Sequence, residues 1–119
     1  MPFDGTNFEQ QDEVLDLLRR ARDRVVMPDG WCQRSRINGN KVCALGALYL
    51  SSYPKGKKHE SHSAELDALR LLGEALPAPY FLVWRYNDMP GRTQAEIAAL
   101  YDRAIAKRVA KLQTDRMKA

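Results

Sequence analysis

Two short stretches of the chain carry side chains of the types that bind small molecules: Trp31, Gln33, Cys43, Asn87, Asp88 and Arg92. A guanidinium fork, a carboxylate and amide groups brought together would hold a small anionic or nucleotide-like ligand. The same residue types also close turns and satisfy backbone groups. We therefore expect a polar cluster that cross-links loops, with a ligand pocket or enzyme site around Trp31, Asp88 and Arg92 as the alternative.

Nucleophilic catalysis by a cysteine would require a thiolate with a base beside it. Cys43 begins a predicted helix, whose dipole favours a thiolate, but His59 and His62 lie in a basic loop and at a helix start with no partner implied. Cysteine is also a common buried residue. There is no C-x-x-C pair, and two histidines do not define a zinc site. The sequence thus predicts no catalytic residue, no metal and no cofactor, and it favours a protein that is not an enzyme.

Basic side chains gather in one loop and near the end of the chain: Lys55, Lys57, Lys58, Arg103, Lys107, Arg108 and Lys111. Together they could form a basic surface for nucleic acid or for an acidic protein. Cations at a helix C-terminus also occur simply because they suit the helix dipole. The net charge is only +4, and no aromatic residue follows Tyr101, so base stacking is not indicated. Nucleic-acid binding therefore stands as an alternative function.

The strongest helix signal follows the polar residues near Asn87. Thr93 and Glu96 have the spacing of a capping box, in which each side chain bonds the backbone amide of the other residue. After them, residues of one face recur at three- and four-residue intervals: Ile97, Leu100, Tyr101, Ala104, Ile105, Arg108 and Leu112. This spacing predicts a helix that buries one apolar stripe.

The remaining chain reads as helices separated by turns. Thr6 and Glu9 form a second capping box, and Pro79 begins an apolar run that suits a helical turn. The third helix is expected to bury a set of leucines: Leu66, Leu69, Leu72 and Leu76. The sequence predicts an all-α bundle of one domain, residues 1–119, with main helices at about 7–26, 42–53, 61–76 and 93–113 and a short helical turn at 79–86.

Residues 31–41 are irregular and are predicted to form a short hairpin or a loop. Asn38-Gly39 is a strong signal for a two-residue hairpin turn. With Ile37 and Asn40 flanking that turn, Arg34 would face Cys43. Cys32 would then lie out of register with Cys43, so no disulfide is expected.

Four motifs lie along the chain: Trp31 with Gln33, the C-A-L-G-A-L run at 43–48, the N-D-M-P-G-R-T turn at 87–93 and the helix from Glu96 to Ile105. Together they resemble the motifs of an uncharacterised family of small bacterial and bacteriophage proteins. In the family pattern W-N-D-x-x-G-R-T the tryptophan directly precedes the Asn, whereas here Tyr86 precedes Asn87 and Trp84 lies further upstream. The resemblance implies an α-helical domain of phage or prophage origin, and it implies no activity.

Composition limits the remaining choices. Hydrophobic residues make up 45% and charged residues 29% of the 119 positions, which is ordinary for a globular chain. No run is long and apolar enough to span a membrane, and the N-terminus lacks the pattern of a signal peptide, so a cytoplasmic location is expected. The best-supported expectation is a non-enzymatic interaction module, such as a phage regulator or inhibitor that binds a host protein. A homodimer through the last helix is also compatible with the pattern.

Overall fold

The last helix begins where its capping box predicts. The computed structural model describes residues 12–52 and 62–118, and within it helix α6 spans Gln94–Lys118. The Thr93 hydroxyl accepts from the Glu96 amide at 3.2 Å, and the Glu96 carboxylate accepts from the Thr93 amide at 2.9 Å. The predicted capping box is therefore confirmed. The helix continues past residue 113, the predicted end, because no Gly or Pro interrupts the sequence before Lys118.

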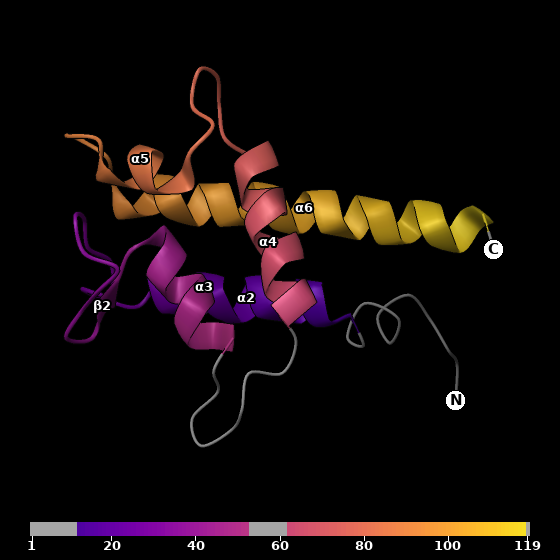
Figure 1. Ribbon diagram of the computed structural model, residues 1–119, viewed down its shortest axis with the longest axis horizontal. Helices are drawn as coiled ribbons and strands as arrows, with labels where there is room; N and C mark the ends of the chain where they lie inside the picture. The colour runs from indigo at the N-terminus through magenta and orange to yellow at the C-terminus, as the bar shows by residue number, and fades with distance from the viewer. Residues whose placement is uncertain (1–11, 53–61, 119) are drawn as a thin grey trace.

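Helix α2, Glu13–Val25, runs antiparallel to α6 (Figure 1). Near one end the Asp12 carboxylate meets Arg108, and at the other the Gln94 amide donates to the carbonyl of Val25 at 2.6 Å. Helix α6 buries Tyr101 of the stripe that the spacing predicts, and α2 buries an apolar face that includes Leu18. The described part of the helix predicted at 7–26 is thus confirmed, and the capping box of Thr6 and Glu9 lies outside the described residues.

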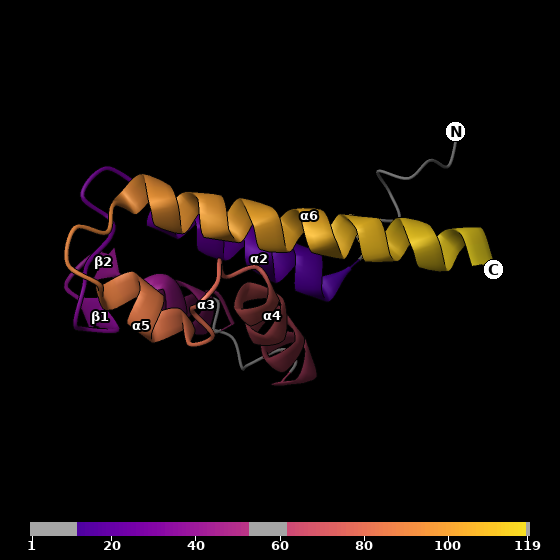
Figure 2. The ribbon, with the colours of Figure 1, turned by 90° about the horizontal axis from the view of Figure 1, so that it is seen from above.

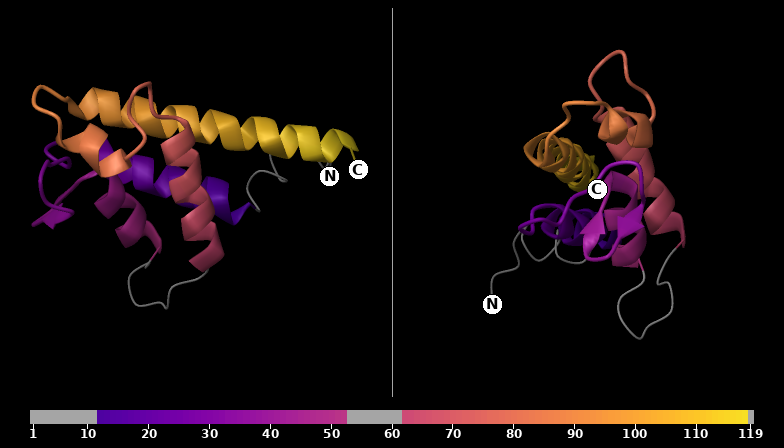
Figure 3. Two further views of the ribbon diagram at one scale, coloured as in Figure 1. Left: turned by 45° about the horizontal axis from the view of Figure 1, so that its top comes forward. Right: turned by 90° about the vertical axis from the view of Figure 1, so that its left-hand side faces the viewer.

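Helices α3, Ala44–Ser52, and α4, His62–Glu74, pack on this pair, and α4 crosses it (Figure 3). The predicted buried face of α4 is partly correct: Leu72 is buried and Leu76 packs against the core, but the prediction is wrong for the other two leucines. Its core positions are Ala64, Ala68 and Leu72, followed by Ala75 directly after the helix, whereas Leu66 and Leu69 are 52% and 38% exposed. A crossing helix comes closest along its smallest side chains, so the alanine stripe faces the core and turns those two leucines outward.

Helix α5, Val83–Asp88, lies close to the start of α6 (Figure 2). A short helix was predicted at 79–86, and it forms four residues later, because Leu82 is extended and acts as the N-cap. Its last residues are therefore Asn87 and Asp88, which the sequence placed in the following turn. Gly91 then takes a positive φ of 83° in the turn that leads to α6.

The predicted hairpin forms, with a different register. Strand β1, Ile37–Asn38, pairs antiparallel with β2, Lys41–Val42, so the two-residue loop is Gly39-Asn40 rather than Asn38-Gly39. Gly39 has a φ of 63°, which suits glycine at the first loop position. Arg34 consequently does not face Cys43. The Cys43 amide instead donates to the carbonyl of Arg36 at 3.0 Å, and both cysteines are free thiols.

The predicted fold class is confirmed, because all regular structure in the described residues is helical except the hairpin of β1 and β2. We call this hairpin, residues 37–42, the ribbon. The ribbon also shortens α3, because Val42 pairs in β2 and the helix starts at Ala44 rather than at 42. Helix α4 ends at Glu74 instead of 76. No helix among residues 12–52 and 62–118 combines the length and apolarity needed to cross a bilayer.

Candidate functional site

One buried amide joins three segments that lie far apart in the sequence. The Asn87 side chain is fully buried, and its oxygen accepts from the Trp31 indole at 2.7 Å and from the Ala44 amide at 3.0 Å. Its nitrogen donates to the Cys32 carbonyl at 3.1 Å and to the Asp88 carboxylate at 2.9 Å. A primary amide offers two donors and two acceptor positions, so Asn87 is saturated.

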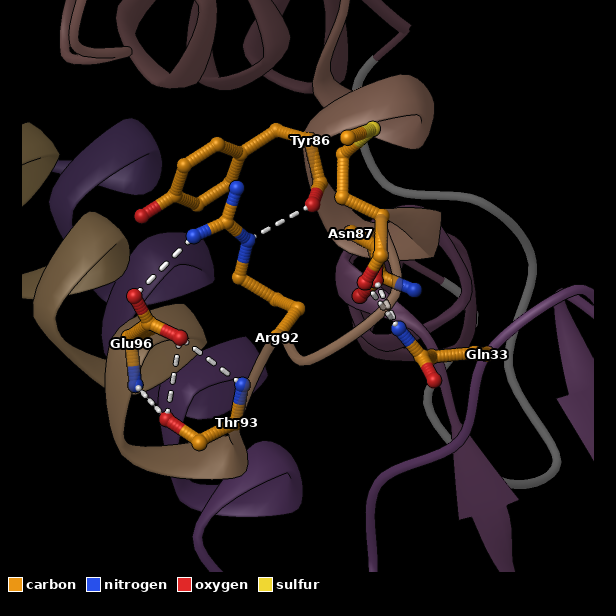
Figure 4. A network of polar contacts seen from close by, with 7 residues as sticks. Gln33, Tyr86, Asn87, Arg92, Thr93 and Glu96 are labelled. Carbon is orange, nitrogen blue, oxygen red and sulfur yellow. Dashed lines mark hydrogen bonds and ion pairs between the residues drawn. The ribbon is translucent and has the colours of Figure 1, made fainter.

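The segment before β1 caps the C-terminus of α5. The Gln33 amide donates to the carbonyls of Asn87, at 3.0 Å, and of Met89, at 2.8 Å, as Figure 4 shows. The Asp88 carboxylate accepts from the backbone amide of Arg34 at 2.9 Å, and Arg34 holds a φ of 66°. The last carbonyls of a helix lack partners within the helix, so these bonds fix the ribbon to α5.

Arg92 occupies the other side of α5. Its guanidinium donates to the carbonyl of Tyr86 at 2.9 Å and to the Glu96 carboxylate at 3.0 Å. It also lies 3.8 Å from the centroid of the Tyr86 ring (Figure 4) and 5.5 Å from that of Tyr80. Arg92 therefore ties α5 to the first turn of α6 by hydrogen bonds, an ion pair and ring stacking.

The six residues predicted as a polar cluster do not share one pocket. Trp31, Gln33, Asn87 and Asp88 form a connected hydrogen-bond network, which we call the Asn87 network. Cys43 is the residue before Ala44, whose amide joins this network. Asp88 and Arg92 form no ion pair with each other, because Asp88 turns towards the ribbon and accepts a backbone amide, and Arg92 turns towards Glu96. The geometry is that of a cross-link between segments.

The outer side of α5 carries a feature that the sequence reasoning missed. Trp84 is 50% exposed and Phe81 is 78% exposed, with Leu82 and Met89 also exposed nearby. We call these four residues the α5 patch. Phe81, Leu82 and Met89 line one hollow of about 370 Å³, and Trp84 lines a separate one of about 250 Å³. The sequence predicted a short helical turn at 79–86 without assigning its faces, and the position of the helix at Val83–Asp88 shows which side faces outward.

A family model described as a family of unknown function, DUF6197, matches residues 9–107. The chain belongs to this family. The expected membership of an uncharacterised family is thereby confirmed, and the match contains the whole Asn87 network, α5 and the ribbon. No curated protein and no solved structure matches the chain.

The cysteines of this DUF6197 chain do not have the environment of a catalytic thiolate. Cys43 is buried, and its sulfur accepts from the Gly46 amide at 3.3 Å. Burial, and next the nearby Cys43, raise the pKa of the Cys32 thiol, which disfavours its reactive form. Among the described residues, no group of three or more His, Cys, Asp or Glu is placed to hold a metal ion.

The predicted basic surface is divided by the fold. Lys55, Lys57 and Lys58 lie outside the described residues. On α6, Arg103 donates to the carbonyl of Ala75 at 3.0 Å, and Lys111 pairs with Asp115 at 3.1 Å. Arg108 makes a two-pronged pair with Asp12, at 2.7 and 2.8 Å. Lys107 alone of the four α6 cations has no ion pair or hydrogen bond within the described residues.

The pair of Asp12 and Arg108 joins the N-cap of α2 to α6. Asp12 also accepts from the Leu15 amide at 2.8 Å, which caps the helix. Burial raises the pKa of Asp12, but the hydrogen bonds from Arg108 and Leu15 and the guanidinium charge outweigh it and leave the pKa below its ordinary value. The folded state therefore prefers the carboxylate. The resulting stabilisation is complete above the ordinary pKa and is lost as the pH falls through the lowered one.

We expect the variant Asp12→Asn to lower the free energy of unfolding by about 1–2 kcal/mol at pH 7, because it retains the cap acceptor and removes the ion pair. The difference from the parent protein should shrink towards zero as the pH falls through the lowered pKa of Asp12. Urea unfolding at a series of pH values measures it. Asp115→Asn is the control, since an exposed pair contributes at most about 1 kcal/mol. A difference for Asp12→Asn that stays constant down to acid pH would contradict the assignment.

Proposed function

We propose that this DUF6197 chain is a non-enzymatic protein-interaction module that docks through the α5 patch. The observation that carries the proposal is the exposure of Trp84 on α5 and of Phe81 just before its N-cap, while the inner residues of α5, Val83, Tyr86 and Asn87, are buried. Large exposed apolar side chains that gather on one surface are typical of interaction sites. Tryptophan in particular is enriched among the residues that dominate binding energy.

The anchoring of α5 adds to this argument. A helix of six residues would not be stable alone, and here it is held by the Asn87 network on one side and by Arg92 on the other. A surface that is fixed before binding loses little conformational entropy when a partner arrives. The α5 patch is thus presented on a preorganised support.

The two alternative functions have less support. A small-ligand site would need polar groups that are directed at the ligand. The polar groups of Asn87, Asp88 and Arg92 instead form hydrogen bonds with other groups of the chain. Within the described residues, no buried side-chain nitrogen or oxygen lacks a partner. For nucleic-acid binding, the basic α6 residues Arg103, Arg108 and Lys111 are already engaged with other groups. An engaged cation contributes less to phosphate binding than a free one.

The identity of the partner is a separate part of the proposal. A host protein bound by a phage-encoded regulator follows from the resemblance to bacterial and phage proteins. The α5 patch is compatible with it, since an inhibitor needs a preformed surface and no catalytic group.

Photo-cross-linking tests the docking surface. With a benzophenone amino acid in place of Trp84, irradiation in an extract of the source organism should give a discrete adduct. The same substitution at Met117, which is 85% exposed at the end of α6, is the matched control. The adduct at position 84 should disappear when Phe81→Ser and Met89→Ser are added. Adducts that are equally strong at positions 84 and 117 would contradict the proposal.

A further inference from the structure

Two adjoining hollows run from α5 along α3 to α4. The first has a volume of about 250 Å³ and is lined by Trp84, Arg34, Arg36 and Leu45, among others. The second has about 240 Å³, and its lining includes Leu66. Arg36 and Leu45 line both hollows, so the two adjoin. We call the combined feature the trough.

The second hollow collects the side chains that α4 turns away from the core. Leu66 and Leu69, predicted to be buried, line this hollow together with Leu45, Leu48 and Tyr49, and Arg36 and Glu65 complete the lining with one charge of each sign. Exposing two leucines on one helix face beside a half-exposed tyrosine costs hydration free energy that a partner would recover on binding. The hollow is therefore suited to a large apolar side chain.

Positive charge dominates the end of the trough near α5. Arg34 and Arg36 line the first hollow, and the Arg85 guanidinium lies 6.0 Å from the centroid of the Trp84 ring. None of these three guanidinium groups forms an ion pair with a residue in the described part of the chain. The one carboxylate in this hollow, Asp88, already accepts from the Arg34 amide and from Asn87. The local charge thus favours an anionic partner.

We propose that the trough binds an acidic segment of a partner protein that carries two large apolar side chains. The apolar side chains fill the two hollows, and carboxylates pair with Arg34 and Arg36 by charge-assisted hydrogen bonds. This inference rests on the proposed function, because Trp84 belongs both to the α5 patch and to the first hollow. Beyond that function, it specifies the partner as an acidic segment with two large apolar side chains.

A random copolymer of glutamate and tyrosine is the probe, with biolayer interferometry as the readout. The protein should bind it, and it should bind polyglutamate and a lysine–tyrosine copolymer at least about tenfold more weakly. The double variant R34Q/R36Q should lose about tenfold or more in affinity, and its remaining binding should depend less on salt. The variant L66S/L69S should lose affinity to a similar extent while it keeps the salt dependence.

Matched controls separate the trough from general charge. R70Q/K107Q removes the same two charges from exposed positions of α4 and α6 outside the trough and should bind like the parent protein. Circular dichroism confirms that each variant is folded. Three results would overturn the inference: equal binding of polyglutamate or of a single-stranded oligonucleotide, an equal loss in R70Q/K107Q, or a self-dimer in sedimentation that L66S/L69S dissociates.

The outcome also distinguishes the two proposals. If the adduct at position 84 forms and the copolymer neither binds nor competes with it, α5 docks a partner of different chemistry and only the acidic-segment inference fails. If the copolymer binds through Arg34 and Arg36 while no specific adduct forms at position 84, the trough recognises acidic segments without the α5 patch, and the proposed docking surface fails.

Discussion

Replacement of Asn87 by alanine is expected to lower the free energy of unfolding by about 3 kcal/mol or more, and thereby to leave much of the protein unfolded near physiological temperature. The substitution removes four hydrogen bonds at once. It leaves the buried Ala44 amide and the Trp31 indole without an acceptor, and each unsatisfied buried group costs about 1–3 kcal/mol. Urea unfolding followed by circular dichroism measures the loss.

Two comparisons make the Asn87 result specific. Asn40→Ala changes an exposed loop residue of the hairpin and should shift stability by less than about 0.5 kcal/mol. Asn87→Asp keeps the shape and the acceptor oxygen, but it loses the bond to the Cys32 carbonyl and places a second carboxylate beside Asp88. It should therefore also be strongly destabilising. A loss below about 1 kcal/mol for Asn87→Ala would show that water replaces the amide and that Asn87 does not hold the segments together.

Gly46→Ala should destabilise the protein by several kcal/mol, although alanine is normally the better helix residue. A Cβ atom at position 46 would lie 1.9 Å from the backbone carbonyl oxygen of Arg36. That oxygen also accepts from the Cys43 amide, so the ribbon cannot move away without breaking a bond. We expect severe overpacking, at the upper end of the usual 1–3 kcal/mol or beyond it. Thermal unfolding provides the measurement.

Gly73→Ala is the matched control for Gly46→Ala, since Gly73 also lies within a helix, α4, and a Cβ there would meet nothing within 4 Å. It should stabilise the protein by up to about 1 kcal/mol. The two substitutions are chemically identical and are predicted to act in opposite directions. If both stabilise, the close approach of the ribbon to α3 is absent in solution.

Local patterns predicted the elements well, because their physical causes lie within a few residues. The Thr93 and Glu96 capping box bonds over three positions and fixed the start of α6 correctly. Asn38-Gly39 predicted a hairpin, yet the register shifted because Val42 also bonds to the segment around Trp31. That second contact is not local, and the turn signal contains no information about it.

Tertiary contacts explain the larger errors. A leucine spacing of three to four residues on α4 indicated a buried face, but the crossing of α4 over α2 and α6 requires small side chains at the contact, and Ala64 and Ala68 provide them. The sequence placed Trp31 and Asn87 in one polar cluster because residues of these types need hydrogen-bond partners, and the structure joins the two by a hydrogen bond of 2.7 Å. The direction of Arg92 was not predictable, because Tyr86 and Glu96 compete with Asp88 for one guanidinium.

The hydrogen bonds that hold α5 in place determine at which stage of folding the α5 patch forms. Asn87 and Gln33 join residues that are 43 to 56 positions apart in the sequence. Contacts of such separation form late, after the intervening chain has closed. A proteolytically trimmed chain that lacks the ribbon therefore cannot display Trp84 in its final orientation. Recognition through this tryptophan would then act as a built-in check that only complete, correctly assembled molecules engage a partner.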